Sequence, residues 1–210
     1  MNTNVNLEAP LAALALLGTA FLIFVAAIVL IQSLVVRKLR RAKFVTFAMI
    51  AVVAFYGSGV VAFSFASHNN LLARGQEKHF CELDCHLAYS IVNVAPAASL
   101  AGENAVMVTI KTRFDETTIS RSRGNGLLYP NPRALTLYDD RGNFYAPQSL
   151  SGTPLTMPLR PGESYTTEVV FTLPSGVKPA RLLLNESDWI THLVMGHENS
   201  PFHQKTEFQL

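Results

Sequence analysis

The sequence predicts a two-helix transmembrane hairpin followed by an all-β antiparallel sandwich. Two long uncharged apolar runs occupy the first third of the 210 residues, and a cluster of cations separates them. Beyond them, short segments alternate apolar with polar residues and are punctuated by Gly, Pro, Asn and Asp, which is typical of strands and turns. Because 49% of the residues are hydrophobic, the composition excludes a disordered chain.

Residues 9–36 and 44–66 form the two uncharged runs, and each exceeds the roughly 20 apolar residues that cross a bilayer core. A cleaved signal peptide would begin with cations and carry a shorter apolar stretch, whereas the first eight residues hold no cation. A soluble helical hairpin would show a polar stripe at helical period, which neither run has. We therefore expect residues 1–66 to form a transmembrane hairpin.

Five Lys and Arg residues lie in the short loop 37–43 between the two runs. Short loops rich in cations stay on the cytoplasmic side of a membrane. This distribution predicts that both ends of the hairpin lie outside the cytoplasm in a multi-pass protein of the inner (plasma) membrane. The lipid bilayer is the first expected partner, and nucleic acid is not expected because the cations gather in this one loop.

Residues 67–86 are expected to connect the hairpin to the sandwich and to carry a short helix around 71–82. Residues 87–210 are expected to form the sandwich, since they contain short strand-like segments at fairly even spacing and no long amphipathic helix. The expected strands are 86–94, 106–114, 134–138, 143–145, 164–173, 181–184, 191–194 and 205–210. The turn 139–142 ends in Gly and favours a hairpin between two of them. Trp189, the only Trp, is expected to anchor the core or a hairpin.

The run Leu159-Arg160-Pro161-Gly162-Glu163, followed by Val169-Val170-Phe171-Thr172-Leu173-Pro174, resembles the later half of immunoglobulin-like domains of unknown function. Bacteria attach such domains to membrane or lipid anchors. The resemblance covers about residues 87–210 and implies an extracytoplasmic, immunoglobulin-like antiparallel sandwich with no established activity. The chain lacks the inter-sheet Cys pair that accompanies a core Trp in antibody-type domains.

Both cysteines lie in the segment 79–86, where Cys81 and Cys85 are flanked by His79 and His86. Outside the cytoplasm a local disulfide between Cys81 and Cys85 would persist. The same four side chains offer two thiolates and two imidazoles, which are ligands suited to copper or zinc. The sequence leaves both interpretations open, a structural disulfide and a metal or redox site.

Three further histidines, His192, His197 and His203, lie near the end of the chain. If the closing strands ran beside the first strand, His192 or His197 would join Cys81, Cys85 and His86 in the metal site. No catalytic pair is evident, because the adjacent carboxylates at 115–116 and 139–140 lie in turns and Gly-x-Ser-x-Gly is absent. We therefore expect no enzyme and no bound cofactor. The expected function is a non-enzymatic binding or envelope-assembly module that contacts another envelope protein or itself. The alternative is a copper-handling or thiol-redox protein that uses Cys81, Cys85 and His86.

Overall fold

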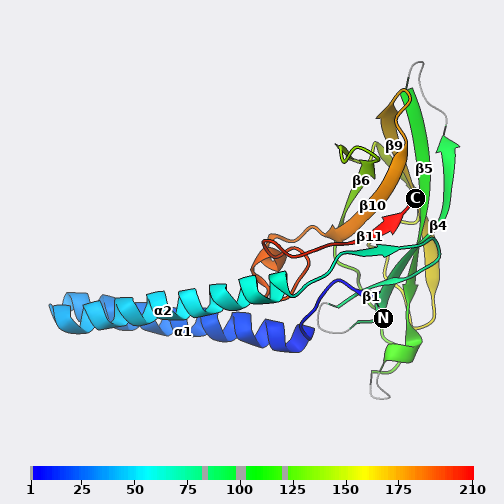
Figure 1. Ribbon diagram of the computed structural model, residues 1–210. Coiled ribbons are helices and arrows are strands. Elements are labelled where there is room, and N and C mark those ends of the chain that lie inside the picture. Colours follow the sequence, from blue (N-terminus) through cyan, green and yellow to red (C-terminus); the bar gives the residue numbers. More distant parts are fainter. Residues whose placement is uncertain (1, 82–84, 98–102, 120–122) are drawn as a thin grey trace. The chain divides into compact units, whose positions relative to one another are not determined.

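The computed structural model describes residues 2–81, 85–97, 103–119 and 123–210 (Figure 1). The chain divides into two compact units. The sandwich unit comprises the described residues within Met1–Val5, His68–Trp189 and Gln204–Leu210. The helical unit comprises Asn6–Ser67 and Ile190–His203. The division differs from the expected one at two places, because residues before the hairpin belong to the sandwich and a late segment belongs to the helices.

Two helices, α1 (Ala9–Val35) and α2 (Leu39–Phe65), form the hairpin of the helical unit. Each has 27 residues and is therefore about 40 Å long, which exceeds the thickness of a bilayer core. Both are long and apolar enough to be membrane spans. The connecting turn is shorter than expected, since Arg40, Arg41 and Lys43 lie in the first turns of α2 rather than in a loop. The buried residues of the hairpin are mostly small, which lets the two backbones approach closely: Ala9, Ala12, Ser33, Ala42, Val60 and Ser64.

The segment Ile190–His203, called the capping segment here, completes the helical unit. A strand was expected over 191–194, but the chain forms the 3₁₀ helix η2 (Trp189–Leu193) there, so that prediction was wrong. Trp189 is 68% exposed, which also corrects the expectation of a core anchor. The Asn6 N–H donates to the Gly196 carbonyl at 2.9 Å. Gly196 has φ +75°, and a Cβ there would lie 2.6 Å from the Leu7 Cβ, so only glycine fits.

The sandwich unit consists of a six-stranded sheet in the order β1-β3-β4-β5-β9-β8 and a five-stranded sheet in the order β2-β11-β10-β6-β7. The strands of the first sheet are β1 (Asn2–Thr3), β3 (Lys78–Phe80), β4 (Leu87–Ala97), β5 (Glu103–Phe114), β9 (Ser164–Pro174) and β8 (Ser149–Gly152). Those of the second are β2 (Asn70–Leu72), β11 (Thr206–Gln209), β10 (Pro179–Glu186), β6 (Arg133–Asp139) and β7 (Phe144–Tyr145).

Most of the expected strands are present, and the β6–β7 hairpin turns at Gly142, which has φ +84°. The helix expected over 71–82 was wrong, because this stretch supplies β2 and β3. The sheets are mixed rather than purely antiparallel, since β1 pairs with β3 and β2 pairs with β11 in parallel. A short 3₁₀ helix, η1 (Glu116–Thr118), follows β5.

The core lies between the two sheets and takes alternate residues from each long strand, as the two-residue period of a strand requires. Val108 and Ile110 face it from β5, and Val169 and Phe171 face it from β9, with no exposed surface. The opposite wall comes from the second sheet, through Leu135, Leu137, Leu182, Leu184 and Phe208. This shared core makes the unit a β-sandwich.

Two cationic side chains are buried at one end of this core. Lys78 donates from Nζ to the carbonyls of Leu184 and Thr206 at 2.6 and 2.9 Å. The Arg133 guanidinium lies over the Phe80 ring at 4.2 Å from its centroid and donates from Nε to the Tyr89 hydroxyl at 3.1 Å. Hydrogen bonds and aromatic faces thus replace the water that these charges lose.

Glu186 supplies the opposite charge for this region. Its Oε1 lies 3.4 Å from Arg133 Nη1, and the two side chains are 5% and 0% exposed. Asn4 donates from Nδ2 to the same carboxylate at 3.2 Å and accepts at Oδ1 from the Cys81 N–H at 3.0 Å. Asn4 is itself 1% exposed, so the residues that precede α1 are built into the sandwich.

Candidate functional site

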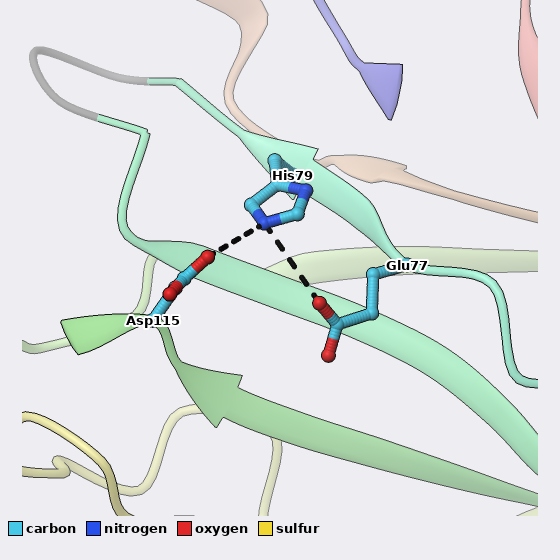
Figure 2. A group of neighbouring side chains, drawn as sticks. All are labelled: Glu77, His79 and Asp115. Atoms are coloured by element: carbon cyan, nitrogen blue, oxygen red, sulfur yellow. Dashed lines mark hydrogen bonds and ion pairs between the residues drawn. The ribbon is translucent and has the colours of Figure 1, made fainter. Parts of the chain in front are cut away.

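The candidate site lies on the outer side of β3, where side chains alternate between the core and the opposite face. Lys78 and Phe80 point into the core, and the carboxylate of Glu77 lies near His79 on the other face. Figure 2 shows His79 from β3 between the carboxylates of Glu77 and Asp115. Asp115 follows directly after β5, which pairs with β4, the neighbour of β3. The cluster therefore ties together two strands that β4 separates.

His79 is the centre of this cluster. Its Nε2 lies 3.2 Å from Asp115 Oδ2 and 3.9 Å from Glu77 Oε2 (Figure 2). The side chains of His79 and Asp115 are 8% and 9% exposed. Because Nε2 faces an acceptor, it is assigned as the protonated nitrogen. The other nitrogen, Nδ1, is buried and has no hydrogen-bond partner among the described residues.

Arg113, from β5, contacts both carboxylates. Its Nε and Nη2 donate to the two oxygens of Glu77 at 2.8 Å each, which is a bidentate ion pair. Its Nη1 also reaches Asp115 Oδ1 at 3.3 Å. Asp115 Oδ1 accepts in addition from the Thr117 N–H and hydroxyl at 3.1 and 2.7 Å, so this carboxylate caps η1.

These contacts set the protonation of the acidic groups. Burial of Asp115 opposes ionisation, but the hydrogen bonds from Thr117, His79 and Arg113 outweigh it and lower its pKa to about 2. The bidentate bond from Arg113 lowers the pKa of Glu77. The same bond raises the pKa of Arg113 above its ordinary value. Both carboxylates are therefore ionised at neutral pH.

Glu77, His79 and Asp115 are the one group of metal-ligand type within the described ranges whose ligand atoms all lie within 4.8 Å of one another. Arg113 occupies both oxygens of Glu77 and contacts Asp115, so a cation would have to displace a guanidinium that is already well placed. The donor set therefore favours an internal ion-pair network that fastens β3 to β5.

Cys81 and Cys85 are bonded to each other in a disulfide, which agrees with the first of the two interpretations of this motif. Cys81 is 2% exposed, and its N–H is held by Asn4. Thiol exchange requires access to a sulfur atom, and of the two cysteines Cys81 is buried whereas Cys85 is half-buried. The hydrogen bond from the Cys81 N–H to Asn4 favours a structural role for the bond next to β3.

Removal of this disulfide should destabilise the protein only moderately. Closure of a five-residue loop contributes about 2 kcal/mol in the chain-entropy model. We expect Cys81→Ser/Cys85→Ser to lower the free energy of unfolding by about this amount, measured by urea unfolding of the full chain in non-ionic detergent. The native protein in reductant is the matched control and should lose the same amount. A loss above about 4 kcal/mol would contradict a purely local role.

The remaining predicted ligands lie in different surroundings. His86 Nδ1 is 2.6 Å from the Thr118 hydroxyl, and its ring stacks on Phe114 at 5.5 Å. His192, His197 and His203 belong to the helical unit, where His197 Nδ1 accepts from the Asn199 N–H at 3.0 Å. A copper or zinc site of Cys81, Cys85, His79 and His86 stays a prediction for the reduced protein.

Glu77, Arg113 and Asp115 were not identified as candidates from the sequence. Asp115 was interpreted as a solvated turn residue next to Glu116, yet it is buried and caps η1. The available signal was the repeated i, i+2 spacing of charged residues, Glu77 with His79 and Arg113 with Asp115, which puts each pair on one face of a strand. The pairing of the two strands through β4 could not be read from that spacing.

No family model matches the chain, and no curated protein matches it. Among solved structures, an uncharacterized beta-sandwich protein from Clostridium difficile is similar at 9% sequence identity and a TM-score of 0.42. The similarity covers 69% of this chain and 95% of that protein.

Proposed function

We propose that the protein is a non-enzymatic, membrane-anchored β-sandwich, held at the outer face of the plasma membrane, that binds or helps to assemble other envelope proteins. The observation that carries the proposal is the pairing of β1 with β3. It builds the residues before α1 into the same domain that follows α2. A hairpin that leaves a folded domain and returns to it has both ends on one side of the membrane.

The charge distribution supports the orientation. Arg37, Lys38, Arg40, Arg41 and Lys43 lie at the turn of the hairpin, remote in chain length from both of its ends. Cations at such turns remain in the cytoplasm. The sandwich then lies outside, where the Cys81–Cys85 disulfide persists.

The strand order supports an immunoglobulin-like topology. Immunoglobulin domains place strands A, B, E and D in one sheet and G, F and C in the other. The orders β4-β5-β9-β8 and β11-β10-β6-β7 correspond to A-B-E-D and to G-F-C with one added edge strand. Domains of this architecture present binding loops at the ends of the sandwich.

One pair of loops offers a surface for a protein partner. Leu128 and Leu159 form an isolated antiparallel bridge, with reciprocal N–H to carbonyl bonds of 2.9 and 3.1 Å. Next to this bridge, Leu127, Tyr129 and Met157 are 42%, 66% and 50% exposed. Exposed apolar side chains held on an ordered loop pair are typical of protein interfaces.

The orientation is tested with two lysine-to-cysteine variants, Lys178→Cys in the sandwich and Lys38→Cys in the hairpin turn, both at exposed positions. A membrane-impermeant maleimide applied to intact cells should label Lys178→Cys. The matched variant Lys38→Cys should be labelled only after the membrane is permeabilised. Labelling of Lys38→Cys in intact cells would overturn the proposed location.

The binding role is tested by replacing Tyr129 with a photo-crosslinking phenylalanine analogue in intact membranes. Irradiation should yield a discrete adduct with an envelope protein or with a second copy of the chain. The same analogue at Lys178 is the matched control and should yield little. Absence of any adduct at Tyr129 would contradict the proposed partner surface.

The second candidate, a copper-handling or thiol-redox protein, is favoured by one observation. The buried Nδ1 of His79 has no hydrogen-bond partner among the described residues, and His79 lies two residues before Cys81. The reduced protein would present this nitrogen together with two thiols. Stoichiometric copper or zinc in the reduced full-length protein, lost in Cys81→Ser, would support this candidate. A metal-free protein with an unreactive disulfide would exclude it.

A further inference from the structure

The helical unit contains a pocket of about 490 Å³, a size typical of small-ligand sites. Both helices and the capping segment line it. On α1 the lining residues Leu16, Thr19 and Ile23 recur at helical spacing, so one face of the helix forms a wall. On α2 the residues Val53, Gly57 and Val61 do the same.

The capping segment closes one end of this pocket. Leu193 and Phe202 contribute apolar surface to it. The Tyr56 hydroxyl donates to the Leu193 carbonyl at 2.7 Å, which fastens the segment to α2. Phe202 stacks on Phe65 at the end of α2, with ring centroids 6.1 Å apart and planes within 8°. A hydrogen bond and an aromatic stack therefore hold the capping segment against α2.

The lining is almost wholly apolar. Thr19, Tyr56 and His192 are its polar members, and the Tyr56 hydroxyl is already bonded to a carbonyl. An apolar lining offers water few hydrogen-bond partners. An apolar ligand is the kind of occupant that fits this chemistry.

The position of the pocket along the two helices shows which part of a bilayer would surround it. At 1.5 Å per residue, Leu16 and Ile23 lie about 10 and 21 Å along α1 from Ala9, the end nearest the N-terminus. By the same measure Val53 and Val61 lie about 18 and 6 Å from Phe65, the end of α2. Because each helix is about 10 Å longer than a bilayer core about 30 Å thick, a centred hairpin projects about 5 Å beyond the core at each end. The pocket residues then lie about 1–16 Å below the outer edge of the core, which is roughly its outer half.

The pocket is also continuous with the outward surfaces of the spans. Leu17, Phe21 and Phe24, which neighbour the lining residues of α1 in sequence, are apolar and 63–65% exposed. In a membrane these surfaces contact lipid hydrocarbon directly. A chain of the adjacent lipid can enter without crossing water.

We propose that this pocket binds one acyl chain of an outer-leaflet phospholipid beneath the capping segment. The inference rests on the proposed membrane insertion of the hairpin. It goes beyond insertion because it assigns one defined binding site for a lipid, in addition to the lipid that surrounds every membrane helix. The bound chain would fill the space between α1, α2 and the capping segment.

The test uses the full-length protein in vesicles of phosphatidylcholine and phosphatidylglycerol that contain a phospholipid with a photoreactive acyl chain. After irradiation, mass spectrometry maps the adducts on the protein. Adducts should concentrate at least three-fold on pocket residues such as Ile23 and Leu193 over lipid-facing residues such as Phe24 and Phe47. Equal labelling of both sets would overturn the site.

Two glycine variants sharpen the test. Gly57 lines the pocket and Gly18 does not, and a Cβ at either position meets no atom within 4 Å. Gly57→Leu should fill the pocket and reduce the adducts at Ile23 and Leu193 at least three-fold, whereas Gly18→Leu should leave them unchanged. Equal effects of the two variants would also overturn the site.

Other occupants give distinct results. Protein–protein adducts at pocket residues would show that a second helix or a second copy fills the space, and would overturn the acyl-chain assignment. The maleimide labelling of Lys178→Cys and Lys38→Cys reports on insertion separately. A correctly inserted protein without preferential pocket labelling would refute this inference and leave the proposed function intact.

Discussion

Glu186→Leu is expected to lower the free energy of unfolding by about 3–5 kcal/mol, the cost of leaving a buried charge without its partner. Glu186 Oε1 faces Arg133 Nη1 at 3.4 Å, and both side chains are almost wholly buried. Loss of the carboxylate removes the acidic group that faces the guanidinium, whose contacts with the Tyr89 hydroxyl and the Phe80 ring carry no negative charge. Asn4 loses an acceptor for its Nδ2 in the same step. Urea unfolding of the full chain in detergent, followed by circular dichroism, measures the loss.

The double variant Arg133→Met/Glu186→Leu is the control. Replacement of a buried ion pair by apolar side chains of similar size is often neutral, because the desolvation cost of both charges disappears. The double variant should therefore be more stable than Glu186→Leu alone. If the double variant were the less stable of the two, the main role of Arg133 would be its contact with Phe80 and Tyr89 rather than its pairing with Glu186.

The sequence predicted the elements that depend on local pattern. The hairpin follows from two uncharged runs, and β5 and β9 follow from alternation of β-branched and aromatic residues. The two-residue strand β1 could not be predicted this way, because a pair of polar residues has no period to recognise. Its place depends on its pairing with β3, which brings Asn2 next to Lys78 and Thr3 next to His79.

The capping segment shows the same limit. Residues 191–194 carry Thr, Leu and Val, which favour a strand by intrinsic preference. Hydrogen bonds with Asn6 and Tyr56 and the stack of Phe202 on Phe65 hold the segment in turns instead. Tertiary contacts between residues far apart in the chain thus outweighed local propensity.

The sequence predicted only those parts of the candidate site whose residues lie close together in the chain. Cys81 and Cys85 are four residues apart, and their pairing was one of two interpretations of the motif. Arg113 and Glu77 are 36 residues apart and meet because β3 and β5 flank β4. A Lys or Arg beside a carboxylate is so common in any sequence that spacing alone could not select this pair.

Asp115→Asn is expected to lower the free energy of unfolding at neutral pH by about 3 kcal/mol. The substitution preserves the size of the side chain but removes the negative charge that Arg113 and His79 contact. It also presents an amide N–H₂ where an acceptor is needed. The same substitution at an exposed aspartate, Asp140→Asn, is the matched control and should change stability by less than about 0.5 kcal/mol.

The pH dependence separates the charge of Asp115 from its shape. Its folded-state pKa of about 2 lies below the ordinary value of 3.8, so the stabilisation is complete above 3.8 and is lost as the pH falls from there to about 2. The native protein should therefore lose more stability than Asp115→Asn between pH 5 and pH 2, and the difference between the two should shrink. Other carboxylates, including Glu77, titrate in both proteins and largely cancel in that difference. A gap that stayed constant across this range would mean that Asp115 acts through its packing, and that its ion pair with Arg113 and its hydrogen bond with His79 contribute little.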